Sequence, residues 1–200
     1  AMRDVPQVIR SVVIDSVYPP QVDLYSQLPV NGARAFETLF KSCADDRACA
    51  AAFPNLKEEF FNLVDRLNSK PITMTITLHS GDQKEALMNG DGLVGLVFQA
   101  LYGTPIIPSL PRMIFDIRDG NYTMAAGLQA EFLAAMDNIS NAMQYSVQCN
   151  EEVPFDTSAD LDAALKQYPQ YGALAAKGQY AFCSAWGVPV TTRLIGVFRD

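Results

Sequence analysis

The sequence contains little positive charge and a single histidine. Its 200 residues include 15 Lys and Arg against 22 Asp and Glu, which gives a formal net charge of −7. Binding to nucleic acid or to an anionic membrane surface requires clustered Lys and Arg, and here these residues are scattered. We therefore expect no nucleic-acid partner, and we interpret the acidity as favouring solubility.

Long hydrophobic runs are also absent. A membrane-spanning helix needs about 20 consecutive apolar residues, whereas the most hydrophobic stretch, Gly92 to Leu101, is short and contains Gln99. The opening residues, Ala-Met-Arg-Asp-Val-Pro, lack the apolar region of a signal peptide. We expect no membrane span in this chain, and we expect any export signal to lie outside it.

The motifs that carry most enzyme chemistry are missing too. There is no Gly-x-Ser-x-Gly turn and no Gly-rich phosphate loop; Gly90-Asp-Gly92 is better interpreted as a turn before a helix. Cys43 and Cys49 have no neighbouring histidine, so we predict no metal site and no cofactor. His79, in a predicted hairpin, has no serine and acid at recognisable spacing. We therefore predict no catalytic residue in this chain.

The four cysteines indicate an oxidising compartment. Cys43 and Cys49 are close in sequence, and Cys149 and Cys183 then remain as a second pair. The chain-entropy argument assigns about 2 and about 4 kcal/mol to these two closures. Four buried free thiols are the alternative, and four cysteines allow three connectivities. We favour two disulfides, and hence a secreted, periplasmic or other extracytoplasmic location.

Hydrophobic periodicity predicts a mostly helical chain with one strand at its start and one hairpin. Gln7 to Val17 is rich in β-branched residues, as in a buried parallel strand. Ile72 to Leu78 alternates apolar residues with Thr, and with Glu85 to Met88 it predicts a small hairpin. Met143 to Cys149 is predicted to be extended. The predicted helices are 31–42 with Asn31 as N-cap, 45–52, 55–70 capped by Asn55, 91–102, 105–118, 122–139, 156–168 capped by Asp156 or Thr157, and 171–185.

The opening strand has no partner that this chain encodes. No later segment suits parallel pairing with it, and a lone strand cannot satisfy its own backbone groups. We therefore predict that residues 1–18 are the remnant of a larger core, that residues 19–190 form a helical domain, and that residues 191–200 return towards that core.

Three passages carry a resemblance to a known family. Met-Arg-Asp-Val-Pro-Gln-Val-Ile-Arg-Ser-Val-Val-Ile-Asp-Ser-Val-Tyr-Pro-Pro resembles the α/β-hydrolase segment that follows the nucleophile elbow. Ser-Val-Gln-Cys-Asn-Glu-Glu and Phe-Cys-Ser-Ala-Trp-Gly resemble cap motifs of the tripeptidyl aminopeptidase and prolyl iminopeptidase-like branch. The resemblance covers essentially the whole chain. It implies a mostly α fold: the helical cap (lid) domain of an α/β-hydrolase with one leading sheet strand and a small β-hairpin.

The resemblance also implies substrate-binding residues. Aminopeptidases of this type resemble one another in using cap carboxylates to hold the substrate's α-amino group, and Glu151 matches the Cys-x-Glu position, with Glu152 beside it. An ammonium group in a partly dry cleft needs an anionic partner. A solvated acidic pair in a loop is the alternative. Tyr18, near the carboxyl end of the opening strand, is predicted to line the active-site mouth, with packing under the cap as the alternative. Trp186 is predicted to pack near a disulfide.

Three hypotheses for function follow. The first is the cap of a secreted serine peptidase that acts on peptides with a free amino end; this chain alone would be inactive. The second, its nearest variant, is the cap of an esterase that acts on small acyl substrates. The third is a self-standing extracytoplasmic helical binding module without catalysis. In either form of the cap hypothesis, apolar surface left without its catalytic partner is expected to drive self-association.

Overall fold

The computed structural model describes residues 6–13, 15, 22–137, 139–175 and 177–189. Over these residues the chain is mostly α-helical with one two-stranded antiparallel sheet, which confirms the predicted fold class at that level. The helices are α1 (Leu24–Asp45), α2 (Arg47–Ala52), α3 (Leu56–Ser69), α4 (Gly90–Ala100), α5 (Leu110–Arg118), α6 (Thr123–Met136), α7 (Asn141–Glu151), α8 (Ser158–Gln167) and α9 (Lys177–Trp186). Short 3-10 helices are η1 (Pro6–Val8), η2 (Ile107–Ser109), η3 (Val153–Phe155) and η4 (Pro169–Leu174).

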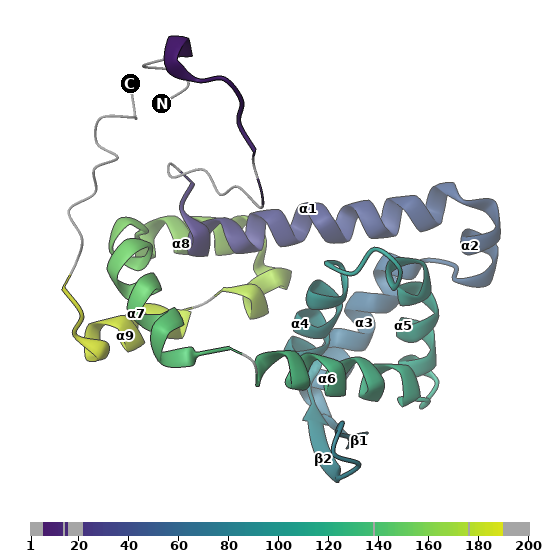
Figure 1. The fold of residues 1–200 in the computed structure, drawn as a ribbon. Helices are drawn as coiled ribbons and strands as arrows, with labels where there is room; N and C mark the ends of the chain where they lie inside the picture. Colours follow the sequence, from purple (N-terminus) through teal and green to yellow (C-terminus); the bar gives the residue numbers. More distant parts are fainter. Residues whose placement is uncertain (1–5, 14, 16–21, 138, 176, 190–200) are drawn as a thin grey trace.

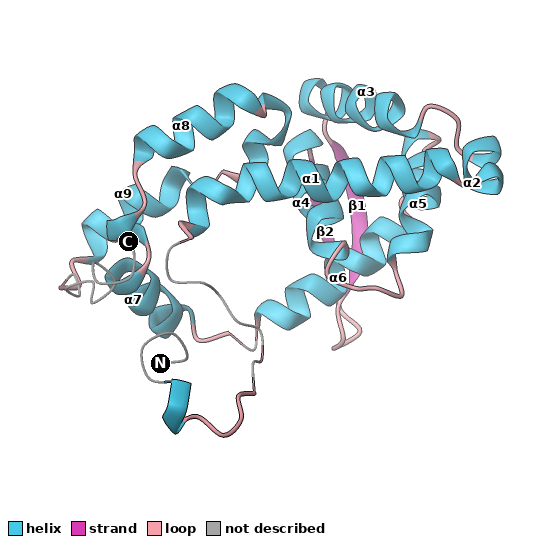
Figure 2. Cartoon of the chain, turned by 90° about the horizontal axis from the view of Figure 1, so that it is seen from above, coloured by secondary structure: helices cyan, strands magenta, loops and turns pink. Residues whose placement is uncertain are grey.

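The longest helix, α1, joins two groups of elements. Helices α2, α3 and α5 lie towards one of its ends and α7, α8 and α9 towards the other (Figures 1 and 2). The predicted start at Asn31 was too late, because α1 begins at Leu24 and continues through Pro29. Proline removes one backbone hydrogen bond, but Pro29 is buried, as are Tyr25 and Ser26 before it. Tertiary packing therefore extends the helix beyond what local preference predicts.

A cluster of aromatic rings forms the centre of the core. Phe36 of α1 lies with its ring centroid 5.3 Å from that of Phe60 in α3 and 5.1 Å from that of Tyr171 in η4. All three side chains are fully buried. Rings at these separations add to the free energy of apolar burial. The core therefore brings together segments that are more than a hundred residues apart in the chain.

The predicted hairpin is confirmed. β1 (Ile72–Thr77) pairs antiparallel with β2 (Gln83–Met88). The alternation in β1 buries Met74 and Ile76, while its three threonines are exposed. The hairpin leads directly into α4, where the Asn89 side chain accepts a hydrogen bond from the backbone N–H of Gly92 at 2.8 Å. This is an N-cap, and it sets where the helix begins.

Both disulfide pairings are confirmed. Cys43–Cys49 joins the end of α1 to α2, and Cys149–Cys183 joins α7 to α9, each with the two Cα atoms 5.1 Å apart. No cysteine is left free. Two disulfides are compatible with an extracytoplasmic location, since such bonds persist in oxidising compartments.

The predicted opening strand is not formed by the residues that the structure describes there. Pro6–Val8 form the short helix η1, and residues 9–13 and 15 belong to no strand. Val8 is 74% exposed and Val13 is 93% exposed. A β-branched run favours a strand, but a strand also needs a neighbour to accept its hydrogen bonds. Tyr18 and the return segment 191–200 lie outside the described residues.

Two further predictions near the C-terminal end were wrong. Residues 143–149, predicted to be extended, belong to helix α7. The single helix predicted over 171–185 is two elements, η4 and α9. In α7, Tyr145 and Cys149 lie one turn apart and both contact α9. Contacts with a partner helix outweigh the weak local preference of this sequence.

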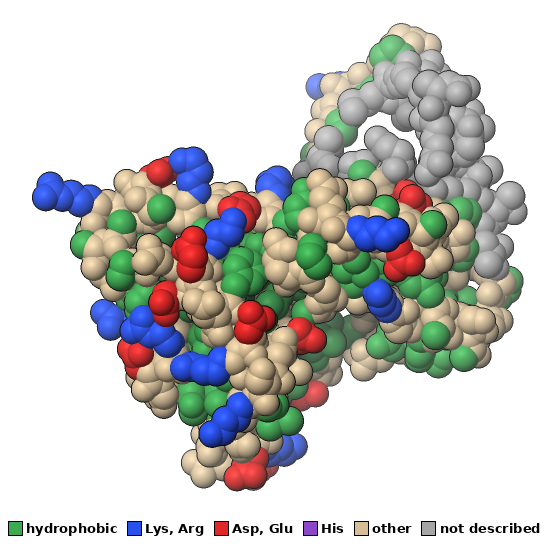
Figure 3. Space-filling model, turned by 180° about the vertical axis from the view of Figure 1, so that it is seen from behind, with side chains coloured by type: hydrophobic (Ala, Val, Ile, Leu, Met, Phe, Trp, Pro, Cys, Tyr) green, Lys and Arg blue, Asp and Glu red, His purple; other side chains and the backbone are tan. Residues whose placement is uncertain are grey.

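Charges of both signs are interspersed on the face drawn in Figure 3, which shows no large patch of Lys and Arg. Within the described ranges, none of the helices combines the length and the apolar character that a membrane crossing requires.

Candidate ligand-binding cleft

A cleft of about 690 Å³ opens where α1, α4, α6, α7, η4 and α9 meet. Its size lies within the range of small-ligand sites in proteins. The described side chains that line it come from segments spread over most of the chain: Leu24, Tyr25, Leu28, Gly92, Gly95, Leu96, Phe98, Gln99, Tyr102, Gln129, Phe132, Met136, Asn141, Gln144, Tyr145, Gln148, Ala173, Leu174 and Gln179. The cleft is therefore a product of the tertiary fold.

The lining combines polar and apolar side chains, and none of the described lining residues is charged. Six of its residues bear a carboxamide, namely Gln99, Gln129, Asn141, Gln144, Gln148 and Gln179. No Asp, Glu, Lys, Arg or His is among the described lining residues. Aromatic and aliphatic side chains make up much of the remainder, so the walls offer apolar contact and hydrogen bonds together. Such a surface suits an uncharged ligand with hydrogen-bonding groups.

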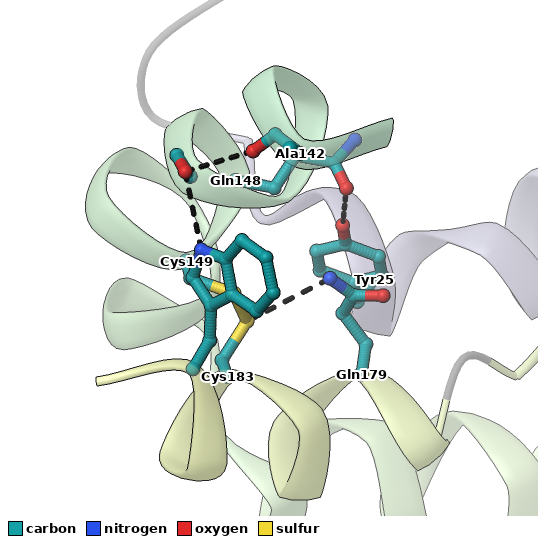
Figure 4. Close-up of a disulfide and its surroundings, with 8 residues drawn as sticks. Tyr25, Ala142, Gln148, Cys149, Gln179 and Cys183 are labelled. Atoms are coloured by element: carbon teal, nitrogen blue, oxygen red, sulfur yellow. Dashed lines mark hydrogen bonds between the residues drawn. A yellow bond between two sulfur atoms is a disulfide. The ribbon is translucent and has the colours of Figure 1, made fainter. Parts of the chain in front are cut away.

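Helix α7 forms one wall and places three carboxamides on one face. Asn141, Gln144 and Gln148 are separated by three and four residues, which is the spacing of one side of an α-helix. Gln148 also links the cleft walls, because the Tyr25 hydroxyl of α1 donates a hydrogen bond of 2.6 Å to its Oε1 atom (Figure 4). Tyr25 is 5% exposed and Gln148 is half-buried, so this partly buried bond ties α7 to the first turn of α1.

Contacts with α9 help to fix the position of α7. The Cys149–Cys183 disulfide joins the two helices, and the side-chain amide nitrogen of Gln179 lies 3.6 Å from the sulfur of Cys183 (Figure 4). The ring of Tyr145 lies 4.3 Å from that of Phe182. Because a disulfide and ring packing act together, the α7 wall is held in place although few of its side chains are buried.

Trp186 belongs to the same set of contacts. Its ring stacks on Phe182 at 5.3 Å, and its indole N–H donates a hydrogen bond of 3.1 Å to the Ser146 hydroxyl. Trp186 is thus placed on α9 one turn from Cys183, as predicted. Its side chain remains 41% exposed.

A buried carboxylate orders the neighbouring start of α1. Asp156 is 7% exposed and accepts a hydrogen bond of 2.8 Å from the backbone N–H of Ser26. A carboxylate at a helix N-terminus is favoured because the first N–H groups lack partners within the helix. Burial of the Tyr180 phenol, followed in importance by the nearby Asp156 charge, raises the pKa of Tyr180. Asp156 therefore links the end of η3 to the helix that carries Tyr25.

The two glutamates predicted to bind substrate lie at the far end of the same wall. Glu151 is the last residue of α7 and is exposed, whereas Glu152 follows it and is half-buried. Neither is among the residues that line the cleft. Glu151 comes three residues after Gln148, so it continues the polar face of α7 beyond the cleft. Tyr18 is not among the described residues.

The carboxamide face of α7 does not follow from the elements predicted for this segment. Asn141, Gln144 and Gln148 have a helical spacing that was visible in the sequence, but residues 143–149 were predicted to be extended, and a strand would place alternate residues on opposite faces. A helical prediction for this segment would have revealed the face. The contributions of Gln99, Gln129 and Gln179 come from other helices and carry no local signal.

The other residues considered for chemistry lie apart from the cleft. His79, in the turn after β1, has its Nε2 atom 3.4 Å from a carboxylate oxygen of Glu131, and both side chains are mostly exposed. Across the described part of the chain, no three His, Cys, Asp or Glu side chains gather in a way that could hold a metal ion. The polar groups that the described cleft walls offer to a ligand are uncharged carboxamides and phenols.

Comparisons of this chain with protein-family models, with curated proteins and with solved structures find no match.

Proposed function

We propose that this chain is the substrate-selecting cap of a secreted serine α/β-hydrolase of the aminopeptidase type. The observation that carries the proposal is the placement of Glu151 and Glu152 at the C-terminal end of α7, next to a cleft wall fixed by a disulfide. In this proposal the two carboxylates hold the α-amino group of a peptide, and the cleft receives the rest of it. The reacting serine, acid and histidine belong to a core outside this chain.

The physics of the helix end favours a cation there. The C-terminal end of a helix carries a partial negative charge, and a carboxylate at that end is disfavoured until a cation arrives. An ammonium group would interact favourably with the helix end and with Glu151 at once. A carboxylate in this unfavourable position is explained more easily by a binding role than by stability.

Exposed apolar side chains support the presence of a core that the cap covers. Val8, Val12 and Val13 are 74%, 48% and 93% exposed, and Met143 and Val147 of α7 are 66% and 47% exposed. Contiguous apolar surfaces commonly mark contacts with another protein, and in this proposal these side chains face the core. We expect the isolated chain to self-associate through them, which analytical ultracentrifugation over a range of concentrations would detect.

The proposal is tested by asking whether a free amino end is recognised. The purified, oxidised chain is titrated by two-dimensional NMR with alanine-leucine-alanine amide and with its N-acetylated form. We expect the free peptide to shift the amides of Glu151 and its neighbours and the acetylated peptide to bind more weakly. Glu151→Gln should remove the difference, whereas Glu131→Gln, on the exposed face of α6, should retain it. Equal binding of the two peptides by the wild-type chain contradicts the proposal.

The absence of catalysis in the isolated chain is checked separately. A serine-directed fluorophosphonate probe should leave the chain unlabelled, and stoichiometric labelling of one residue would show that it carries its own nucleophile. An esterase cap is distinguished by its ligands: small acyl esters, rather than peptides with a free amino end, would then shift the α7 amides.

A self-standing binding module is the second candidate, and one observation favours it. The described walls of the cleft all come from this one chain, so a ligand could bind without a catalytic core. The neighbouring coding sequence separates the two proposals. An in-frame Gly-x-Ser-x-Gly upstream and an Asp and His loop downstream would support the cap, and their absence would favour the module.

A further inference from the structure

The α7 wall has the chemistry to bind a peptide main chain. A carboxamide offers a carbonyl acceptor and an N–H donor, which is the same pair that a peptide group presents. Across the residues that the structure describes, the side-chain amides of Gln99, Gln129 and Gln144 make no hydrogen bond to the protein. In Gln148, the Oε1 atom accepts from Tyr25, so its amide hydrogens remain as donors. The cleft thus holds hydrogen-bonding groups that the fold itself does not use.

The spacing of these groups matches an extended chain. Asn141 and Gln148 are seven residues apart on α7, which corresponds to about 10 Å along the helix axis. An extended peptide advances about 3.3 Å per residue, so about three residues lie along this face. Glu151 stands one turn further on the same side. A peptide whose ammonium lies at Glu151 would therefore run along α7 towards Asn141.

The lining also excludes charge. A charged side chain that enters the cleft loses hydration, and no described lining residue offers an opposite charge in return. Uncharged side chains lose less hydration and gain contact with rings such as Phe98 and Phe132. The walls therefore discriminate between peptides by the charge of their side chains.

From these observations we infer that the cleft binds extended peptides with uncharged side chains, and that Asn141, Gln144 and Gln148 pair with their main chain. This inference rests on the proposed function for the direction of the peptide, because Glu151 fixes the amino end. It adds a substrate class and names the residues that set it. Gln144, at the middle of the face and half-buried, is the residue on which the inference depends most.

The experiment measures dissociation constants of the oxidised chain for three peptide amides by NMR titration. The peptides are alanine-leucine-alanine amide and the two versions with lysine or glutamate at the second residue. We expect the leucine peptide to bind at least about tenfold more tightly than either charged peptide. A fourth peptide, with an ester in place of the second amide bond, lacks one N–H donor and should bind about two- to tenfold more weakly.

Variants at one matched pair of glutamines locate the effect. Gln144→Leu removes a carboxamide from the cleft and should weaken the leucine peptide by about two- to tenfold. Gln167→Leu, at the exposed end of α8 and away from the cleft, should leave the affinity unchanged. Gln144→Glu supplies a negative charge and should reverse the order, so that the lysine peptide binds more tightly than the leucine peptide. Far-UV circular dichroism of each variant checks that the helices are retained.

The outcomes separate this inference from the proposed function. The inference is overturned if charged and neutral peptides bind with equal affinity, or if Gln144→Leu leaves the affinity unchanged. In that case a dependence of binding on a free amino end and on Glu151 would still support the proposed function. Neutral preference without any need for a free amino end supports the inference and contradicts the proposed function. Shifts of the α7 amides by a neutral disaccharide such as maltose, with none from the peptides, overturn both. The absence of any shift with millimolar peptide also overturns both.

Discussion

The two disulfides are expected to contribute unequally to stability, and the difference can be worked out from the chain. The cysteines of Cys149–Cys183 are 34 residues apart and those of Cys43–Cys49 are 6 apart. If each bond acts mainly by restricting the unfolded chain, the longer loop contributes about 4 kcal/mol and the shorter about 2 kcal/mol. The double variant Cys149→Ser/Cys183→Ser should therefore lose about twice as much free energy as Cys43→Ser/Cys49→Ser.

The structure also predicts where the larger effect is felt. Helix α9 has no buried residue and α7 buries only Cys149, whereas α3 buries Phe60 and its neighbours in the core. Without the second disulfide, the contacts that still hold α9 include ring contacts of Phe182 and Tyr180 and the hydrogen bond from Trp186 to Ser146. We expect its amides to open locally, with an opening constant that rises by up to about three orders of magnitude, while α3 stays protected.

Hydrogen exchange followed by mass spectrometry, together with urea unfolding, measures both quantities. The Cys43→Ser/Cys49→Ser variant is the matched control, because it removes the same chemistry from a short loop. Equal losses of unfolding free energy in the two variants would refute the loop-entropy reasoning. Uniform acceleration of exchange in α3 and α9 would refute the claim that α7 and α9 depend on their disulfide more than the core does.

Three further predictions concern single residues. Gly90→Ala should destabilise the chain by about 2 kcal/mol, because the new Cβ atom would lie 2.1 Å from the backbone oxygen of Val64. Gly95→Ala lies in the same helix, and nothing lies within 4 Å of its new Cβ atom. This second substitution should stabilise the chain by about 0.5–1 kcal/mol. Urea unfolding compares the two, and the same sign for both would contradict the packing argument. Burial, and secondarily the charge of a nearby glutamate, raises the pKa of Tyr171 above its ordinary value of 10.0. The folded state thus holds the neutral phenol, so stability should fall as the pH rises above 10, where the unfolded chain loses this proton first. Tyr171→Phe should remove this part of the stability loss at alkaline pH. Because the buried hydroxyl has no hydrogen-bond partner, the substitution should also raise the free energy of unfolding at pH 7 by about 1 kcal/mol. A lower free energy of unfolding at pH 7 would show that the hydroxyl does have a partner. Glu151→Gln should raise the free energy of unfolding by about 0.5 kcal/mol, because it removes a negative charge from a helix C-terminus. A lower stability of this variant in thermal unfolding would argue against the binding role.

Several elements could be predicted from sequence because their signals are local. The alternation from Ile72 to Thr77 exposes the threonines of β1 and buries Met74 and Ile76, with Ile72 half-buried. Thr157 caps α8 by accepting from the backbone N–H of Asp160 at 3.1 Å, as one of the two proposed caps does. The pairing of the cysteines followed from their number and spacing. For the strand and the cap, the physical cause lies within a few residues of the feature. For the disulfides, it is the even number and the spacing of the cysteines.

The remaining features depended on partners far away in the chain. A β-branched run at the start predicted a strand, but strand formation requires a neighbour, and the described residues there form none. Helix α7 was hidden because its stability comes from α9 through a disulfide and ring packing rather than from its own propensities. The sequence by itself determined the mostly helical character, the hairpin, the disulfides and the acidic pair at Glu151 and Glu152. Only the tertiary structure decided that carboxamides from several helices face one cleft, because that arrangement is set by how α1, α4, α6, α7 and α9 pack together.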